Sequence, residues 1–292
     1  MIITRIIGGL GNQMFQYAAG RALSLERRQP LRLDITGYKG YKLHDGFELH
    51  RVFECPAAVA AAEEVHSILR WQSPVVIRRV LARPSMAFIR RDGLVVEPSF
   101  YYWPGIKNVP DDCYLSGYWQ SERYFQEAAS AIRTDFTFKL PLTGKDAGIA
   151  DTIGQVSAVS IHVRRGDYVT DRKNVARYGI CTTDYYLAAA HYISENVKEP
   201  FFFIFSDDIA WVKDHLKIDL PCQYVDHNHG DGSHNDMRLM SMCRHHIIAN
   251  STFSWWAAWL NPDPDKIVIA PKNWFIDKAH IDDLYPRSWI IV

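Results

Sequence analysis

Two adjacent arginines, Arg164 and Arg165, stand directly after the apolar run 156–163, whose last polar residue is His162. A guanidinium presents a planar fork of donors that matches the paired oxygens of a carboxylate or a diphosphate. Ligands of open α/β sheets bind at the carboxyl ends of the strands, so this pattern predicts a site for a phosphorylated ligand. The other interpretation is structural: Arg165 and Asp167 can pair within their loop, with His162 a core residue.

Polar side chains also follow two later apolar runs, 201–205 and 246–249. They are Asp207 and Asp208 after the first run, and Asn250, Ser251 and Thr252 after the second. If these strands are parallel, all the groups lie at one edge of the sheet. Hydroxyls and N–H groups at a helix start suit phosphate oxygens, and a carboxylate can accept both N1–H and N2–H of guanine. Alternatively, one of the two aspartates caps the following helix.

The N-terminal segment has the order strand, glycine loop, helix. The apolar run 2–7 precedes Gly8-Gly9-Leu10-Gly11, and an apolar-periodic helix is expected over 14–25 with Asn12 as its N-cap. The N–H groups at the start of such a helix suit an anion. The dinucleotide fingerprint is incomplete, because Met14 stands where its third glycine belongs, and no P-loop lysine follows.

Two segments offer an alternative chemistry based on a metal ion. Asp263-Pro264-Asp265 has the D-x-D pattern, and a histidine-rich loop follows residue 225. The candidate ligands of that loop are Asp226, His227, His229, Asp231 and His234. We expect no metal at either place, since the first is a proline loop and the second lacks ligand spacing on a defined element. Trp255, Trp256 and Trp259 have helical spacing that core packing explains.

The length of 292 residues suits two domains. A polar, glycine-containing stretch near 140–155 is the expected boundary, which gives domains at 1–150 and 151–292. The C-terminal half alternates expected strands and helices with short connections, which predicts a parallel, doubly wound sheet. The expected strands are 156–163, 201–205, 223–225, 246–249 and 266–269, and the expected helices are 184–197, 209–216, 235–243 and 253–260. The segment 38–110 carries no regular pattern.

Composition narrows the functional classes. The chain has 33 basic and 33 acidic residues and is 48% hydrophobic, so it is expected to be globular without a nucleic-acid partner. Five cysteines without a C-x-x-C pair indicate reduced thiols and a cytoplasmic location. No signal peptide or membrane span is expected. The segment 75–91 carries five arginines among apolar residues, which suggests peripheral contact with the inner membrane face, although Pro84 interrupts it and a solvated face is the alternative.

Three motifs in this chain resemble those of the alpha-1,2-fucosyltransferases of glycosyltransferase family 11, especially the bacterial enzymes that build surface polysaccharide such as O-antigen. They are GGLGNQMFQY at 8–17, HVRRGD at 162–167 and NSTFSWW at 250–256. The second motif is also similar to that of alpha-1,6 and protein O-fucosyltransferases. It therefore marks fucosyl transfer broadly, and the first and third point to family 11.

The resemblance implies an α/β, GT-B-like fold of two Rossmann-type domains, with a mostly parallel sheet in the C-terminal one. It implies an acceptor-side N-terminal domain, a GDP-fucose donor held mainly by the C-terminal domain, and no metal or other cofactor. Arg164 matches the arginine on the donor diphosphate. The expected donor-binding residues are Gly11, Asn12, His162, Arg165, Asp207, Asp208, Asn250, Ser251, Thr252 and Phe253.

The expected reaction is an inverting displacement, in which the 2-hydroxyl of a terminal galactose attacks the anomeric carbon of fucose and GDP leaves. The acceptor is a galactose-terminated oligosaccharide or a lipid-linked glycan. Arg164 stabilises the leaving diphosphate, and Asp167 either serves as a catalytic carboxylate or braces the neighbouring arginines. The motifs supply no evident general base. The alternatives are another GDP-sugar, another acceptor hydroxyl, or a non-catalytic GDP-sugar-binding module.

Overall fold

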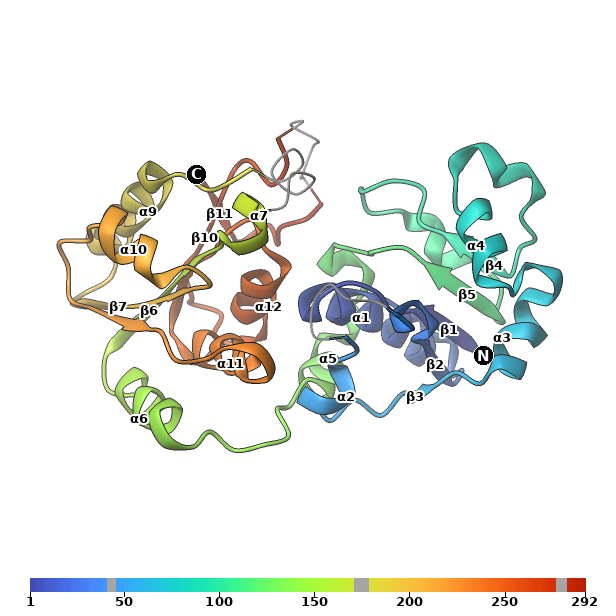
Figure 1. Ribbon diagram of the computed structural model, residues 1–292, viewed down its shortest axis with the longest axis horizontal. Coiled ribbons are helices and arrows are strands. Elements are labelled where there is room, and N and C mark those ends of the chain that lie inside the picture. The colour runs from blue at the N-terminus through green and yellow to red at the C-terminus, as the bar shows by residue number, and fades with distance from the viewer. Residues whose placement is uncertain (41–45, 171–178, 277–282) are drawn as a thin grey trace. The chain divides into compact units, whose positions relative to one another are not determined.

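The structure is a computed structural model that describes residues 1–40, 46–276 apart from 171–178, and 283–292. The chain forms two compact units, each with its own sheet (Figure 1). Unit 1 comprises Met1–Lys139 with Asp282–Leu284, and unit 2 comprises Leu140–Ile281 with Tyr285–Val292. The predicted boundary at residue 150 falls inside helix α6 (Gly144–Ile153), which packs against α11 (His234–Met242) of unit 2. The division therefore comes before this helix, at residue 139.

Unit 1 is built on a five-stranded sheet in the order β3-β2-β1-β5-β4, in which every neighbouring pair is parallel. Its strands are β1 (Ile2–Arg5), β2 (Leu31–Asp34), β3 (Ala58–Val59), β4 (Leu94–Val96) and β5 (Cys113–Ser116). The first strand lies within its predicted range. Two strands come from the segment 38–110, for which the sequence predicted none.

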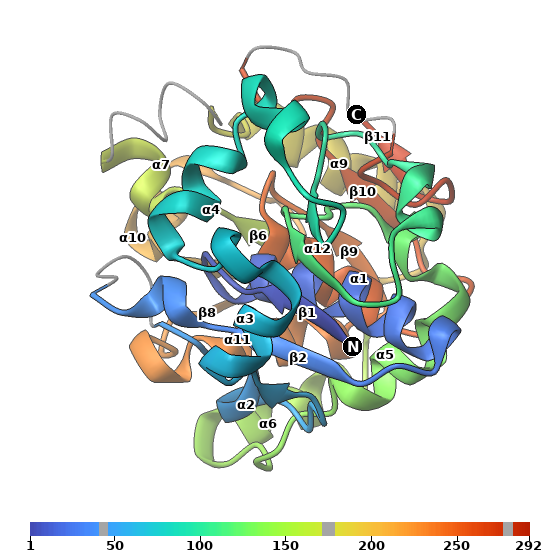
Figure 2. The same cartoon turned by 90° about the vertical axis from the view of Figure 1, so that its right-hand side faces the viewer.

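Helices cover both faces of this sheet. On one face, α1 (Leu10–Arg27) approaches β1 closely at Gly20, where a Cβ would lie 2.1 Å from Thr4 Oγ1. On the other face, α3 (Ala62–Leu69) and α4 (Val75–Leu81) pack against Ile3 and Tyr114 (Figure 2). The remaining helices are α2 (Leu49–Val52), α5 (Ala129–Asp135), η1 (Thr36–Tyr38), η2 (Arg70–Gln72), η3 (Pro84–Ile89), η4 (Pro104–Asn108), η5 (Glu122–Tyr124) and η6 (Gln126–Ala128).

Helix α1 begins earlier than its sequence pattern predicted. Gly9 is the N-cap residue, and its carbonyl accepts from the backbone N–H of Asn12 at 2.9 Å and of Gln13 at 3.1 Å. The prediction of Asn12 as the N-cap was wrong, because the glycine loop already turns into the helix three residues before it. The Asn12 side chain instead accepts a hydrogen bond from Gln120 Nε2 at 2.7 Å.

Unit 2 contains a six-stranded sheet in the order β11-β10-β9-β6-β7-β8, again with parallel neighbours throughout. Its strands are β6 (Ser157–Val163), β7 (Pro200–Ser206), β8 (Cys222–Val225), β9 (His245–Ile247), β10 (Val268–Ala270) and β11 (Ile290–Ile291). The predicted parallel sheet is confirmed, and five of its six strands overlap their predicted ranges. The sixth, β11, has only two residues and was not predicted.

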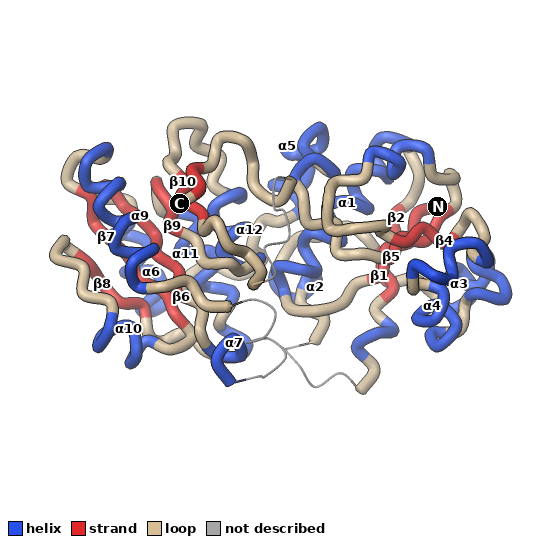
Figure 3. The backbone as a smooth tube through the Cα atoms, turned by 90° about the horizontal axis from the view of Figure 1, so that it is seen from above, coloured by secondary structure: helices blue, strands red, loops and turns tan. Residues whose placement is uncertain are grey.

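The helices of unit 2 lie on both faces of its sheet (Figure 3). Helices α9 (Thr183–Asn196) and α10 (Ile209–His215) pack on Val159, Ile161 and Val163 of β6. Helix α11 packs against α12 (Thr252–Leu260), whose tryptophans are buried against one another as the sequence predicted. The described part of unit 2 also contains the short helices α7 (Gly166–Thr170) and η7 (Gly230–Gly232).

The segment 75–91 is not one continuous amphipathic helix. Helix α4 ends at Leu81, and Pro84 starts the separate 3-10 helix η3. Of its five arginines, Arg78 points inward, is 9% exposed and bonds to Asp34. Within the described residues, no helix is both long enough and apolar enough to cross a membrane.

Candidate functional site

The arginines predicted to bind a ligand lie at the carboxyl edge of the unit 2 sheet. Strands β6 and β7 are in register with Val163 opposite Ser206, so the residues that follow them meet across the strand ends. Arg164 Nη1 lies 2.9 Å from Asp207 Oδ2, and the backbone N–H of Arg165 donates to Asp207 Oδ1 at 2.8 Å. The parallel register thus joins two groups that are about forty residues apart in the sequence.

Gly166 makes room for this arrangement. A Cβ at this position would lie 2.5 Å from Asp207 Oδ2 and would overlap the carboxylate that pairs with Arg164. A side chain here would displace the Asp207 carboxylate, so glycine allows the carboxylate to approach the backbone closely where α7 begins. Asp167 lies in the same helix, but its side chain is outside the part that the structure describes, so its predicted roles stay predictions.

Arg165 has a different environment from its neighbour. Its Nε donates to Asp208 Oδ2 at 3.2 Å, and its Cζ lies 3.6 Å from the centroid of the Trp211 ring. Asp208 is also the N-cap of α10, where Oδ1 accepts from the backbone N–H of Trp211 at 3.2 Å. The cap interpretation of one of the two aspartates is confirmed. The Arg165 side chain is 15% exposed, and its contacts link the end of β6 to α10.

Arg164 is the more exposed of the two arginines, because 28% of its side chain is exposed. Its partner Asp207 has 26% of its side chain exposed. Its guanidinium lies 5.6 Å from the Tyr168 ring centroid, and the Tyr168 hydroxyl donates to the backbone carbonyl of Asn250 at 3.2 Å. These contacts link the ends of β6 and β7 to the segment before α12. The predicted gathering of three polar groups at one sheet edge is therefore observed.

His162 is a buried, neutral imidazole at this edge. Its ring lies 5.8 Å from that of Phe253 in α12, and only 6% of the residue is exposed. Burial, with a smaller contribution from the charge of Arg164, lowers the His162 pKa to about 3. In the described part of the chain its Nδ1 has no hydrogen-bond partner. A buried ring nitrogen of this kind is available to a ligand.

The start of α12 brings the third polar group to the same edge. Ser251 is the N-cap residue, and its hydroxyl accepts from the Phe253 N–H at 3.3 Å, with Thr252 beside it. Asn250 is 1% exposed; its amide donates to the Trp274 carbonyl at 3.3 Å and accepts from the Cys181 thiol at 3.5 Å. Asn250 thus holds the loop in place, a use that the sequence did not indicate.

Gly11 and Asn12 lie in unit 1, in the first turn of α1. The preceding loop turns at Gly8, whose φ of +82° favours glycine. The Gly8 carbonyl accepts from Gln13 Nε2 at 3.0 Å and from the Tyr38 hydroxyl at 2.7 Å. The loop is therefore fixed by side chains of its own helix and of η1, with the Asn12 amide directed to Gln120.

Glu97 is a candidate functional residue that the sequence analysis missed. It follows β4 at the carboxyl edge of the unit 1 sheet, and its carboxylate accepts from the backbone N–H groups of Tyr118 at 2.6 Å and Trp119 at 2.9 Å. Burial raises the pKa of Glu97 to about 7, against those two hydrogen bonds. Trp119 is fully buried with φ of +57°, a conformation that costs energy in a bulky residue. Perturbed carboxyls and strained backbone are both typical of functional sites.

The metal-binding alternatives are used for other contacts. His227 lies 2.9 Å from Asp146, and His234 Nδ1 lies 2.8 Å from the Asp231 carbonyl. Asp263 accepts from the backbone N–H of Asp265 at 2.8 Å, so the D-x-D segment forms a turn. Over the described residues, no three His, Cys, Asp or Glu side chains are grouped so that they could hold a metal ion.

Comparison with known proteins identifies the family. Residues 105–292 match the model of glycosyl transferase family 11. The chain is 36% identical to the alpha-1,2-colitosyltransferase of Escherichia coli, over 99% of this chain and 98% of the relative. It is 30% identical to the O-antigen biosynthesis glycosyltransferase WbnK of Escherichia coli, over 97% of each chain.

The fold matches that of solved GT-B fucosyltransferases, which confirms the expected fold class. The fucosyltransferase NodZ from Bradyrhizobium aligns with a TM-score of 0.56 at 14% identity, over 89% of this chain and 93% of NodZ. At this identity the likeness concerns the fold alone. Taken with the full-length relatives, the chain belongs to glycosyltransferase family 11 and is a glycosyltransferase.

Proposed function

We propose that this protein transfers L-fucose from GDP-β-L-fucose to the 2-hydroxyl of a terminal galactose, with inversion at the anomeric carbon. The observation that carries the proposal is Arg164, held at the end of β6 by the Asp207 carboxylate at 2.9 Å. In a family 11 transferase, a guanidinium fixed at the ligand edge of a parallel sheet suits the diphosphate of a nucleotide sugar. Unit 2 is accordingly the donor-binding unit of the proposal.

Arg164 would act on the leaving group. As the bond between the fucose anomeric carbon and the β-phosphate oxygen breaks, negative charge grows on that oxygen. A guanidinium already held in place stabilises this charge more in the transition state than in the ground state. We propose that the reaction needs no metal, because the Arg164 guanidinium and the N-terminal N–H groups of α12 would contact the diphosphate oxygens in its place.

The neighbouring residues would bind the donor. His162 is neutral at physiological pH, so its ring offers a hydrogen bond without adding charge. The Thr252 hydroxyl and the N-terminal N–H groups of α12 suit phosphate oxygens, and Asp207 is a candidate acceptor for guanine N–H groups. Arg165 and Asp208, joined at 3.2 Å, would position this edge rather than touch the donor.

Glu97 of unit 1 is our candidate for the proton acceptor. In the proposed step, galactose O2 forms a bond to fucose C1 and the C1–O bond to the diphosphate breaks, with its electron pair leaving on GDP. The proton of the 2-hydroxyl passes to the Glu97 carboxylate. A carboxyl with a pKa of about 7 is matched to this task at neutral pH. Unit 1, with Glu97, Asn12 and Gln120, is accordingly the acceptor-side unit of the proposal.

A second candidate donor is GDP-colitose, because the full-length relative at 36% identity is named a colitosyltransferase. Colitose is L-fucose without its 3-hydroxyl. A site that hydrogen-bonds a hydroxyl rejects the deoxy analogue by about four orders of magnitude, whereas an apolar site separates the two by only about a hundredfold. The donor preference thus reports whether a polar group of the site faces that hydroxyl.

For the biological setting, we propose a cytoplasmic enzyme of surface polysaccharide synthesis, in keeping with the relative named for O-antigen biosynthesis. Peripheral contact with the inner membrane face is supported by exposed apolar side chains among the arginines of segment 75–91. Phe88 is 84% exposed and Val76 is 71% exposed, with Arg79, Arg83 and Arg91 at the surface around them. Such a mixture suits an anionic lipid surface.

The first test is calorimetry of GDP, UDP and CMP binding with EDTA present. We expect selective binding of GDP; preference for UDP, or binding that requires a metal, would overturn the donor assignment. GDP-fucose, GDP-colitose and GDP-mannose are then compared in a transfer assay with galactosides, and the product linkage is read by NMR. Transfer of mannose alone, or linkage to a hydroxyl other than O2, would contradict the proposed reaction.

A further inference from the structure

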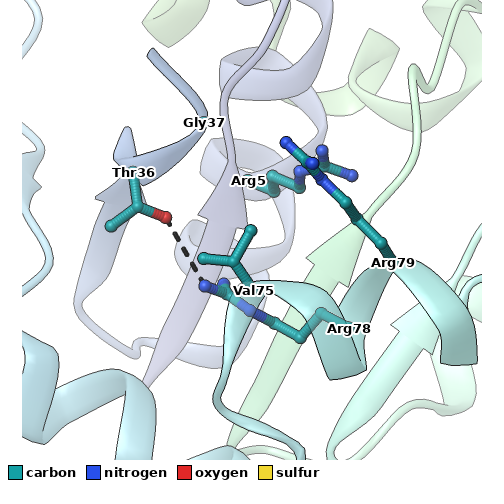
Figure 4. A pocket seen from close by; sticks show the side chains of 6 residues that line it. All are labelled: Arg5, Thr36, Gly37, Val75, Arg78 and Arg79. Carbon is teal, nitrogen blue, oxygen red and sulfur yellow. Dashed lines mark hydrogen bonds between the residues drawn. The ribbon is translucent and has the colours of Figure 1, made fainter. Parts of the chain in front are cut away.

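Unit 1 has a second basic site that the proposed reaction does not use. It is a small, open pocket at the carboxyl ends of β1 and β2 (Figure 4). Its lining residues are Arg5, Thr36, Gly37, Val75, Arg78 and Arg79. Arg5 ends β1, Thr36 starts η1 just after β2, and the two other arginines come from α4. The pocket therefore lies at the edge where parallel sheets bind ligands.

The inner wall of the pocket is neutral and rigid. Arg78 is 9% exposed and bonds to the Asp34 carboxylate and the Tyr114 hydroxyl through Nη1. Its Nη2 lies 3.4 Å from Thr36 Oγ1, the contact drawn in Figure 4. Burial would raise the Asp34 pKa, but hydrogen bonds from Thr36 and Tyr114 and the charge of Arg78 hold it below its usual value. The charge of Arg78 is thus balanced by an ionised carboxylate.

The outer wall carries the positive charges of two arginines. Arg5 and Arg79 line the same pocket from different elements, and Figure 4 shows their side chains directed toward each other. Within the described residues, neither guanidinium has a hydrogen bond or an ion pair. Two guanidiniums that converge repel each other unless an anion lies between them.

We propose that this pocket binds a phosphate or diphosphate group. Two guanidinium forks supply donors in pairs, and the balanced Arg78–Asp34 wall leaves a net charge of about +2 in the pocket, which Thr36 also lines. These are the donors and the charge that a phosphoryl oxygen cluster requires. The anion is either free phosphate or diphosphate, or a diphosphate ester at the end of the acceptor glycan. All of its lining residues belong to unit 1, and the proposal does not depend on the proposed reaction.

The binding test uses the full chain saturated with GDP, so that the donor site is occupied, and titrates inorganic pyrophosphate and phosphate by calorimetry. We expect one pyrophosphate site, with Arg5→Gln and Arg79→Gln each weakening its Kd by about tenfold or more. Arg83→Gln is the matched control, because Arg83 is an exposed arginine next to α4 that does not line the pocket. Absence of binding beside GDP, or equal weakening by Arg83→Gln, would overturn the proposal.

A kinetic comparison identifies the source of the anion. Two acceptors with the same glycan are used, one with a free reducing end and one carrying a diphosphate ester there. If the ester is the natural occupant, Arg79→Gln raises KM for the esterified acceptor by about tenfold and leaves the free glycan unchanged. Equal KM values for the two acceptors in the wild type assign the pocket to free phosphate. Because pyrophosphate binding is read without turnover, failure of the proposed transfer leaves this test of the pocket intact.

Discussion

The carboxyl edges of the two sheets carry opposite chemistry. In unit 2 the edge holds the cationic Arg164 with its Asp207 partner at 2.9 Å, and burial keeps the nearby His162 uncharged. In unit 1 the matching edge holds Glu97, whose carboxylate accepts from two backbone N–H groups and whose pKa burial raises to about 7. In the proposed reaction, one edge would stabilise negative charge and the other would take up a proton. Two parallel sheets of different strand order would thus supply different halves of the proposed transfer.

The cationic edge is expected to give the largest effect. Arg164→Ala removes the charge that would stabilise the leaving diphosphate, and we expect kcat to fall by about 100- to 1000-fold. Because Arg164 is partly exposed, the unfolding temperature should change little. Steady-state rates with GDP-fucose and a galactoside, together with a thermal melt, measure both quantities.

Arg164→Lys sharpens this prediction, since it keeps the charge and loses the planar fork. We expect a rate between those of the wild type and the alanine variant. If Arg164→Ala turns over like the wild type while folded, Arg164 has no part in the reaction, and the contrast between the two edges disappears.

Glu97, at the edge of the unit 1 sheet, is expected to give the next largest effect. Glu97→Gln cannot accept a proton, and we expect kcat to fall by about 100-fold, with GDP affinity unchanged. In the wild type, kcat should rise about tenfold per pH unit below about pH 7 and level off above it, because the ionised form is the base. The variant should lack this rise. A pH series of both proteins measures it.

The groups around Glu97 decide how this profile is read. The backbone N–H groups of Tyr118 and Trp119 face it. The Tyr124 phenol interacts with its charge, and burial raises the pKa of that phenol far above neutrality. A merely structural Glu97 predicts a different outcome, in which the variant melts at a lower temperature and keeps the wild-type pH profile. That result would remove the base from unit 1.

The pKa of Glu97 also makes a prediction about stability. A carboxyl whose pKa rises from 4.5 in the unfolded chain to about 7 on folding favours the protonated, folded state. Its contribution to the free energy of unfolding is present below about pH 4.5 and is lost as the pH rises through 7. We therefore expect Glu97→Gln to gain stability relative to the wild type from about pH 5 to about pH 8, by roughly 1–3 kcal/mol. Denaturant titrations of both proteins at the two pH values measure it.

Sequence predicted the unit 2 edge well and the unit 1 edge poorly, for a physical reason. Strands β6 and β7 are seven residues each, buried and continuous, so their ends and the polar residues after them stand out. Strands β3 and β4 have two and three residues, too few for any periodicity. Glu97 follows β4 and was therefore missed together with its strand. The signal that remained was a short apolar run ending at Glu97-Pro98.

The sequence did not predict which side chains pair in the site, even where it predicted the strands that carry them. Asp208 could be anticipated as a helix cap, but its pairing with Arg165 depends on the register between β6 and β7. Burial of Asn250 depends likewise on the loop around Trp274, which lies far along the chain. Residue type predicts which groups gather at an edge, whereas tertiary packing decides which of them remain open to a ligand.

His162 should give a smaller effect that does not vary with pH. His162→Phe keeps a buried ring and removes both nitrogens, and we expect GDP affinity to fall by about fivefold through one lost hydrogen bond. Since the His162 pKa is about 3, the ratio of wild-type to variant affinity should stay constant between about pH 5 and about pH 8. A ratio that grows toward acid pH would mean that the ring is charged when GDP binds.

The second arginine–aspartate pair should give the smallest effect on turnover and a measurable effect on stability. Asp208→Ala removes the N-cap of α10 and the partner of Arg165, which Trp211 already holds in place at 3.6 Å. We expect a loss of about 1 kcal/mol in the free energy of unfolding, with kcat within about threefold of the wild type. Asp226→Ala is the matched control, because it breaks only an exposed pair with Lys213 and should cost well under 1 kcal/mol. If Asp208→Ala instead lowers kcat as far as Arg164→Ala does, both arginine–aspartate pairs act on the donor. The lower exposure of Arg165 would then not mark it as a positioning residue.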